Sequence, residues 1–290
     1  VNALLFYWIA IISEGGFFVQ RQSTFVMAQM ASEGSPEVNL EKAKKAIEKA
    51  VSLYHPDVVI FPELYMSLFP SGTAHEIALA TAQPLDGPFV IQMREQARQH
   101  GIWLIFGMNE AVEASDDHRN YNTTLVINSE GEIVSTYRKT HLYDAFGYKE
   151  SDTIKAGDRF FEPIETPFGK IGLFVCYEVR FPEVARYQRS KGADIIVMPT
   201  AWMAGKLKSH HFRTLITARA IENTVYMLAC DQCNADTIGE SVAVDPMGVP
   251  IASGGESEEL LVARIDLDRV EAVRAKLPAY KDRRPELYTI

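Results

Sequence analysis

Three stretches of the sequence each place one reactive side chain directly after an apolar run of the kind that forms a β-strand. Glu63 follows residues 58–61, Lys139 follows residues 133–138, and Cys176 follows residues 170–175. Side chains at such positions are held rigidly and still reach a binding site. A thiol, a carboxylate and an ammonium together predict an acyl-transfer site that works without histidine.

Each of the three groups has a distinct role in that chemistry. Glu63 takes the proton of Cys176, and the thiolate attacks a carbonyl carbon. Lys139 and the backbone N–H of Tyr177 stabilise the resulting oxyanion. Glu63 then protonates the leaving nitrogen and later activates water, which releases the acyl group. The sequence therefore predicts a cysteine-dependent hydrolase of non-peptide C–N bonds.

Taken singly, each of these residues has a plainer interpretation. Glu63 also fits a surface acid or a helix cap, although a position after a buried run raises the pKa of a carboxyl. Lys139 also fits an exposed basic strand end, and Cys176 a buried structural cysteine. In favour of chemistry, Cys176 lies shortly before an expected helix start at Phe181-Pro182, where a helix N-terminus favours the thiolate. The combination of the three groups makes the catalytic interpretation the stronger one.

These stretches resemble the nitrilase superfamily, also called the carbon–nitrogen hydrolases. The resemblance lies in short motifs at residues 61–63 (Phe-Pro-Glu), 137–142 (Tyr-Arg-Lys-x-His-Leu) and 176–182 (Cys-Tyr-Glu-x-Arg-Phe-Pro). It continues through residues 199–202 and 218–223 to the Arg-Arg-Pro at 283–285, and so covers residues 24–290.

The resemblance implies a Glu-Lys-Cys triad on an α/β fold, a four-layer αββα sandwich of two packed mixed sheets with outer helices. It also implies homodimers or larger homo-oligomers in which sheets extend across the subunit interface. Many members carry a second glutamate between the lysine and cysteine segments, and Glu150 matches that place. Glu150 is then expected to position Lys139 and the substrate, while a solvated loop acid is the alternative.

The branch within the superfamily is indicated by the residues around the cysteine. Tyr177 stands where true nitrilases usually have tryptophan, and the motif at 176–182 resembles the omega-amidase and deaminated-glutathione amidase branch. Arg180 has the planar fork that suits a substrate carboxylate. It fits equally well as a cap of the next helix or as a partner of Glu178 or Glu183.

The substrate predicted from these residues is a small linear amide whose other end carries a carboxylate, hydrolysed with water. Trp202 follows a strand end and either lines the pocket or belongs to the core. Tyr143, with Tyr65 and Phe146, is a candidate pocket wall. The alternatives are an N-carbamoyl amino acid amidohydrolase, a nitrilase, and an inactive binding or scaffold protein on the same fold.

The cysteine pair Cys230 and Cys233 forms a C-x-x-C motif, which occurs in redox proteins and in zinc sites. No second pair and no suitable histidine cluster accompanies it, so ordinary strand-end cysteines are the favoured interpretation. We expect no metal and no cofactor.

The segments that must position these residues alternate between stretches with helical spacing of apolar residues and short apolar runs typical of strands. Helical spacing predicts helices at residues 40–54, 88–100, 182–190, 207–223 and 268–276. Apolar runs predict strands at residues 24–30, 57–61, 102–108, 122–128, 133–138, 170–175, 194–198, 224–231, 241–245 and 260–265. Residues 140–159 have no clear period and are expected to form a long functional loop. This mixture favours helices outside two packed sheets.

Composition excludes several classes of function. The 290 residues carry a formal net charge of −9, which gives no electrostatic footprint for nucleic acid. Three cysteines make a poor disulfide framework and fit a reducing compartment, so a cytoplasmic location is expected.

The first 23 residues differ from the rest. Residues 1–12 are almost wholly apolar, yet the run is too short to span a bilayer and lacks the features of a signal peptide. We therefore expect no membrane role. The sequence predicts an apolar extension at 1–23 that packs on the protein or on a partner subunit, followed by one hydrolase domain at 24–290.

Overall fold

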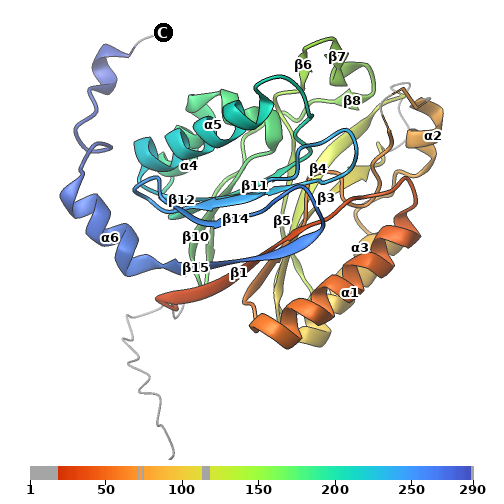
Figure 1. Cartoon of the computed structure of the whole chain (residues 1–290), viewed down its shortest axis with the longest axis horizontal. Helices are drawn as coiled ribbons and strands as arrows, with labels where there is room; N and C mark the ends of the chain where they lie inside the picture. Colours follow the sequence, from red (N-terminus) through yellow and green to blue (C-terminus); the bar gives the residue numbers. More distant parts are fainter. Residues whose placement is uncertain (1–18, 71, 74, 113–117, 289–290) are drawn as a thin grey trace, which may run out of the picture.

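The apolar runs of the sequence form the strands of two sheets that pack face to face in the computed structural model (Figure 1). The structure describes residues 19–288 except 71, 74 and 113–117, so residues 1–18 of the expected extension lie outside it. Within the described part, no helix is long and apolar enough to cross a membrane.

The first sheet has the strand order β15-β1-β2-β3-β4-β5. Its central strands β1, β2 and β3 are parallel, and the outer strands pair antiparallel, apart from β8, which pairs parallel with β4. The strands are β1 (Gln22–Gln29), β2 (Val58–Ile60), β3 (Trp103–Glu110), β4 (Asn120–Ile127), β5 (Ile133–Arg138), β8 (Ile154–Lys155) and β15 (Glu259–Asp266).

The second sheet has the order β14-β13-β12-β11-β10-β9, and it is mixed in the same way. Strands β10, β11 and β12 are parallel, and the others pair antiparallel. The strands are β9 (Ile164–Thr166), β10 (Gly169–Leu173), β11 (Ile195–Thr200), β12 (Tyr226–Asp231), β13 (Val242–Val244) and β14 (Pro250–Ser253).

Alternation along a strand divides the core into two clusters, as β1 illustrates. Phe25 and Met27 point toward the second sheet, where they join a cluster with residues such as Leu173. Val26 and Ala28 point the other way, into a cluster with apolar residues of α1 (Pro36–Tyr54) and α3 (Pro88–His100). Both faces of β1 are buried, which is why its sequence is a continuous apolar run.

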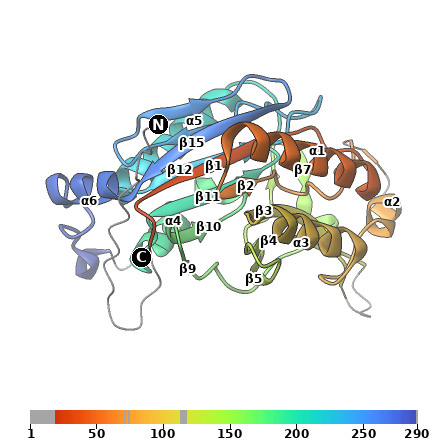
Figure 2. The same cartoon turned by 90° about the horizontal axis from the view of Figure 1, so that it is seen from below.

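Helices α1 and α3 lie side by side (Figure 2), and α4 (Pro182–Ser190) and α5 (Lys208–Asn223) lie on the opposite side of the strands from them (Figure 1). Helices α1 and α3 pack on the first sheet, and α4 and α5 pack on the second. Helix α6 (Leu267–Lys276) follows β15. The α/β class and the two mixed sheets agree with the sequence prediction.

The differences from the predicted elements have local causes. Helix α1 begins at Pro36 rather than Leu40, because Ser35 caps it and proline occupies its first turn. The expected loop at 140–159 contains β6 (Asp144–Ala145), β7 (Tyr148–Lys149), the 3-10 helix Glu150–Asp152 and β8. The short elements α2 (His75–Ala80), β9 and β14 were not predicted, since so few residues show no reliable period.

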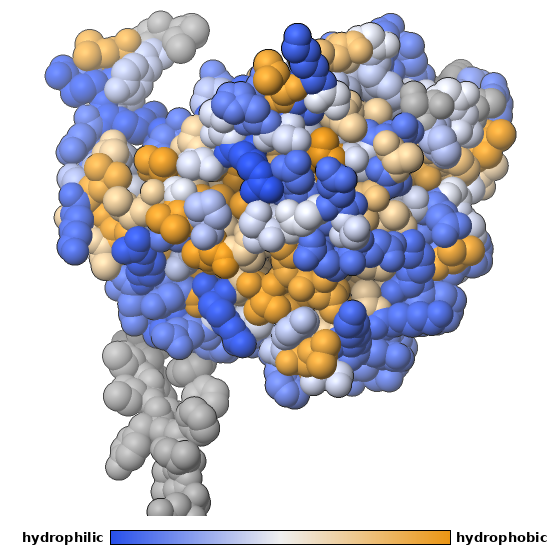
Figure 3. Space-filling model, viewed as in Figure 1, coloured by the Kyte–Doolittle hydropathy of each residue, from blue (hydrophilic) through white to orange (hydrophobic). Residues whose placement is uncertain are grey.

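Apolar side chains also reach the outer surface of the second sheet and the turn beside it. The exposed ones there include Met247, Val249 and Ile251, and Figure 3 shows apolar side chains gathered near the middle of the face seen in Figure 1. Scattered apolar residues are normal on a protein surface, so this area by itself identifies no partner.

Candidate active site

The turn after β2 holds Glu63 at the carboxyl end of this central strand of the first sheet. Leu64 adopts a left-handed conformation with φ 52°, and its backbone lies against Gly107 of β3. A Cβ atom on Gly107 would stand 2.4 Å from Leu64 N, so glycine is required for this approach. Glu63 is only 2% exposed, and its Oε2 accepts the N–H of Ala201 at 2.7 Å.

Lys139 follows β5 and lies between two carboxylates. Its Nζ donates to Glu63 Oε1 at 2.9 Å and to Glu150 Oε2 at 2.9 Å, and its side chain is 2% exposed. Burial opposes the charge, but Glu150, Glu63 and Cys176 outweigh burial and hold the pKa of Lys139 well above its usual value. Lys139 is therefore a permanent cation.

Glu150 enters the same cluster from the 3-10 helix after β7. Its Oε2 accepts the N–H of Tyr143 at 2.6 Å in addition to the bond from Lys139. The structure thus places Glu150 in the buried cluster and not in solvent, where the alternative interpretation put it.

Asn122 of β4 joins the two carboxylates and was not predicted from the sequence. Its Nδ2 donates to Glu63 Oε1 at 2.7 Å and to Glu150 Oε1 at 3.1 Å. Its backbone carbonyl accepts the backbone N–H of Lys139 at 2.9 Å. The N-terminal half of β4 is polar throughout (Asn-Tyr-Asn-Thr-Thr), so no sequence signal distinguishes Asn122 from its neighbours.

Cys176 stands at a sharp turn shortly after β10. Its φ is 48°, and it begins a 3-10 helix that spans Cys176–Arg180. Burial and the charge of Glu63 raise the pKa of the Cys176 thiol, and Lys139 offsets only part of this effect. Helix α4, which the sequence analysis expected to favour the thiolate, begins six residues after Cys176, and the helix that starts at Cys176 itself is the short 3-10 helix.

Glu178 ties the lysine segment to the cysteine segment. It is fully buried, and its carboxylate accepts bonds from Tyr137 Oη, Thr140 Oγ1, the N–H groups of Thr140 and His141, and the N–H of Val175, at 2.6–3.2 Å. Burial disfavours its charge, but these donors outweigh burial and lower the pKa of Glu178. Glu178 is thus committed to the turn that carries Cys176 and is not a partner of Arg180.

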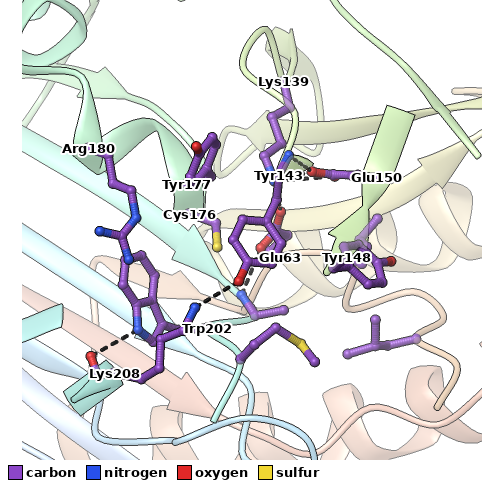
Figure 4. A pocket seen from close by; sticks show the side chains of 14 residues that line it. Glu63, Lys139, Tyr143, Tyr148, Glu150, Cys176, Tyr177, Arg180, Trp202 and Lys208 are labelled. Carbon is purple, nitrogen blue, oxygen red and sulfur yellow. Dashed lines mark hydrogen bonds and ion pairs between the residues drawn. The ribbon is translucent and has the colours of Figure 1, made fainter. Parts of the chain in front are cut away.

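These side chains surround one cavity (Figure 4). Its space is about 540 Å³, part of it open to solvent. Figure 4 shows the sulfur of Cys176, the carboxyl of Glu63 and the amine of Lys139 side by side at its wall. The predicted residues Glu150, Tyr143, Tyr177, Arg180 and Trp202 also line it, with Leu64, Leu68, Tyr148, Ala201, Met203 and Lys208.

Arg180 presents buried donors that have no partner among the described residues. Its Nε and Nη2 are buried and make no hydrogen bond, and its Cζ lies 4.9 Å from the centroid of the Trp202 ring. Neither the helix cap nor the pairing with Glu178 or Glu183 is found for it in residues 19–288. A partly buried guanidinium whose Nε and Nη2 have no partner among the described residues is suited to an anionic ligand.

Lys208 is a second cation in the cavity that the sequence did not indicate. Its Nζ donates to Tyr143 Oη at 2.7 Å and lies 4.0 Å from the centroid of the Phe146 ring. Burial, and then the charge of Arg180, lower the pKa of Lys208. Within the described residues Lys208 has no carboxylate partner. A ligand carboxylate could therefore pair with both Lys208 and Arg180.

The aromatic candidates have different roles. Trp202 is 3% exposed, and its Nε1 donates to Lys208 O at 3.1 Å, so it belongs both to the core and to the cavity wall. Tyr143 packs edge-to-face on Tyr177. Tyr65 is fully buried against Asn39 and does not reach the cavity, so its expected place as a wall is wrong.

The C-x-x-C cysteines lie away from the cavity wall. Cys230 belongs to β12, and its thiol donates to the carbonyls of Ala28 and Ile60. Among the described residues no cluster of three potential metal ligands is found.

Comparisons with known proteins give one consistent family. The model of the carbon–nitrogen hydrolase family matches residues 26–275. Deaminated glutathione amidase of Escherichia coli O157:H7 is 35% identical over 252 residues, which cover 87% of this chain and 92% of that protein. Omega-amidase NIT3 of Saccharomyces cerevisiae is 30% identical over 274 residues, which cover 89% of this chain and 92% of that protein.

The solved structures agree with the sequence comparisons. The Caenorhabditis elegans NitFhit protein matches with a TM-score of 0.84 at 33% identity, over 93% of this chain and 67% of that one. Yeast Nit3, described as a member of branch 10 of the nitrilase superfamily, matches with a TM-score of 0.81 at 26% identity, over 93% of this chain and 99% of that one.

Proposed function

Because the chain belongs to the carbon–nitrogen hydrolase family, we propose that it hydrolyses a small, carboxylate-bearing linear amide through a thioester on Cys176. The observation that carries the proposal is the cavity that collects the thiol, the Glu63–Lys139–Glu150 cluster, and two cations, Arg180 and Lys208, that have no carboxylate partner among the described residues. The resemblance to amidases of the omega-amidase branch supports the amide as substrate.

The first half-reaction forms the thioester. Glu63 accepts the thiol proton as the sulfur bonds to the amide carbon, and the carbonyl electrons move onto oxygen. Lys139 and the N–H of Tyr177 stabilise that oxyanion, and the N–H is free because it belongs to the first turn of a helix. The C–N bond breaks as Glu63 returns its proton to nitrogen, and ammonia leaves.

The second half-reaction uses water. Glu63 takes a proton from water, and the hydroxide attacks the thioester carbon. The tetrahedral intermediate collapses, the C–S bond breaks, and the proton on Glu63 returns to the sulfur as the acid leaves. Glu150, with Asn122, holds Lys139 and Glu63 in place.

An ammonia-release screen tests this function. We expect ω-amides of dicarboxylic acids to be hydrolysed faster than neutral aliphatic amides, carbamoyl amino acids or nitriles. Faster hydrolysis of a carbamoyl compound or a nitrile would favour those alternative reactions. Binding of acidic amides without any turnover would favour the scaffold alternative.

The carboxylate preference is tested at Arg180. We expect Arg180→Ala to raise KM for acidic amides and to lower their kcat/KM by about ten- to a hundredfold, because a bond to a charged group is lost. Neutral amides of the same length should change little. Lys208→Met, which keeps most of the stem, should act in the same direction.

Initial-rate kinetics on matched acidic and neutral amides measure this difference. Arg98→Ala is the control, since Arg98 pairs with Glu95 on the exposed face of α3 and lies outside the cavity. An equal loss for acidic and neutral amides in Arg180→Ala would contradict a carboxylate site.

The same proposal includes the organisation of the protein. We propose one hydrolase domain at 24–290 with an extension at 1–23, a four-layer αββα order, a homodimer or larger homo-oligomer, and a cytoplasmic location. The positions of α1, α3, α4 and α5 support the layer order. The oligomer rests on the family resemblance, and three free cysteines support a reducing compartment.

A further inference from the structure

Two buried polar atoms near the nucleophile have no hydrogen-bond partner among the described residues. They are Thr200 Oγ1 and Asp231 Oδ2, and both residues are 0% exposed. Thr200 ends β11, Asp231 ends β12, and the two residues are partners in the parallel register. Buried polar atoms without partners are rare and call for an explanation.

The remaining atoms of Asp231 are already used. Its Oδ1 accepts the N–H of Trp202 at 2.7 Å, and its own N–H donates to Ser241 Oγ at 2.8 Å. Only Oδ2 is left, and the Thr200 hydroxyl interacts with this carboxyl.

The Thr200 hydroxyl also lies close enough to the Cys176 thiol to favour its charged form, although no hydrogen bond joins the two in the described structure. The next residue, Ala201, donates its N–H to Glu63 at 2.7 Å. Thr200 therefore lies where the second sheet meets both the nucleophile and its base.

The environment of Asp231 disfavours a carboxylate. Burial, followed by the charge of Glu63, raises the pKa of Asp231 well above its usual value and outweighs the N–H groups of Trp202 and Gln232 and the Thr200 hydroxyl, which favour the charged form. An ionised Asp231 would be a buried charge with no ion-pair partner in the part of the chain that the structure describes, which is costly. A neutral acid instead has one hydrogen to donate from Oδ2.

We propose that Asp231 is a positioning residue for the nucleophile: as a neutral acid it donates from Oδ2 to the Thr200 hydroxyl, which donates its own hydrogen to the Cys176 sulfur. The inference rests on the proposed role of Cys176. It assigns a purpose to both orphaned atoms.

The proton count of the reaction is unchanged by this arrangement. When Glu63 takes the thiol proton, the sulfur becomes a hydrogen-bond acceptor, and the Thr200 hydroxyl turns its hydrogen toward it. Asp231 satisfies the oxygen of Thr200 and keeps its own proton. The sulfur thus gains a charge-assisted hydrogen bond without a further negative charge in a cavity that already holds Glu63 and Glu150.

Paired variants distinguish a neutral donor from a carboxylate. Asp231→Asn keeps an acceptor for Trp202 and a donor for Thr200, so kcat should stay within about twofold of the native value. Asp231→Val removes both, and kcat should fall at least about tenfold with little change in KM, because a bond to a charged sulfur is lost. Thr200→Val should show the same loss of kcat, whereas Thr200→Ser, which keeps a hydroxyl, should have nearly native kcat. Both Thr200 variants leave the bond from the Trp202 N–H to Asp231 in place.

The pH dependence of Cys176 alkylation by iodoacetamide is the second readout. Asp231→Val and Thr200→Val should shift its midpoint to higher pH, whereas Asp231→Asn and the control Ser241→Ala should not. The infrared C=O band of a protonated carboxylic acid should be present at neutral pH and vanish in Asp231→Asn.

Equal losses in Asp231→Asn and Asp231→Val, or no band, would overturn the proposal, as would native kinetics in Thr200→Val. These outcomes can be distinguished from a failure of the proposed function. If the proposed function were wrong, no thioester would form on Cys176 during turnover, whereas the infrared band would still report the proton on Asp231.

Discussion

Replacing Cys176 by alanine is expected to abolish ammonia release while the protein remains folded. Without the sulfur no thioester forms, and loss of a covalent nucleophile lowers kcat by at least about a thousandfold. The side chain is small and 7% exposed, so the free energy of unfolding should fall by only about 1 kcal/mol. Ammonia assays and urea unfolding measure the two quantities.

Mass spectrometry makes this prediction specific to the sulfur of Cys176. Native protein quenched during turnover should carry the acyl group on the peptide that contains Cys176, and Cys176→Ala should carry none. Cys233→Ala is the matched control, because Cys233 is only partly buried and does not line the cavity. Residual turnover in Cys176→Ala above about one per cent of native would contradict its role as nucleophile.

The strands that precede the three site residues, and the bounds of two helices, were predictable because apolar runs and the positions of proline and glycine indicate them locally. The apolar runs before Glu63, Lys139 and Cys176 do form β2, β5 and β10. Helices α3 and α4 have the predicted bounds, since proline begins both and glycine ends α3. A strand that is buried on both faces is a continuous apolar run in the sequence, and such a run can be recognised without knowing the tertiary structure.

The residues that the sequence did not indicate act through tertiary contacts. Asn122 acquires its role only when β4 lies beside the cluster, and Lys208 only when α5 brings it over Tyr143. Glu178 was considered as a partner for Arg180, yet the turn at Val175 uses its carboxylate instead. No spacing rule reports such contacts, because they join residues far apart along the chain.

Burial, and then the charge of Glu63, raise the pKa of the Cys176 thiol and so favour its protonated form at rest, while Lys139 offsets part of this effect. In the proposed mechanism the thiol proton therefore moves to Glu63 only as the sulfur bonds to a substrate carbonyl, which takes up the charge. A thiol is also less reactive than a thiolate toward oxidants.

Glu63→Gln is therefore expected to lower kcat and at the same time to make the Cys176 thiol more acidic. Without its base the enzyme loses kcat by about a hundred- to ten-thousandfold. The charge of Glu63 raises the pKa of Cys176, so its removal should lower that pKa and shift the alkylation midpoint to lower pH. The amide also cannot accept from both Lys139 and the Ala201 N–H, which should cost about 1–3 kcal/mol of unfolding free energy.

Glu150→Gln separates the charge of the cluster from the function of the base. It removes one carboxylate beside Lys139 but leaves Glu63 able to accept the thiol proton. We expect a smaller loss of kcat than in Glu63→Gln, and measurable thioester in the quenched protein. If Glu63→Gln retained native kcat, or raised the alkylation midpoint, Glu63 would not be the base, and Glu150 would be the remaining buried carboxylate on Lys139.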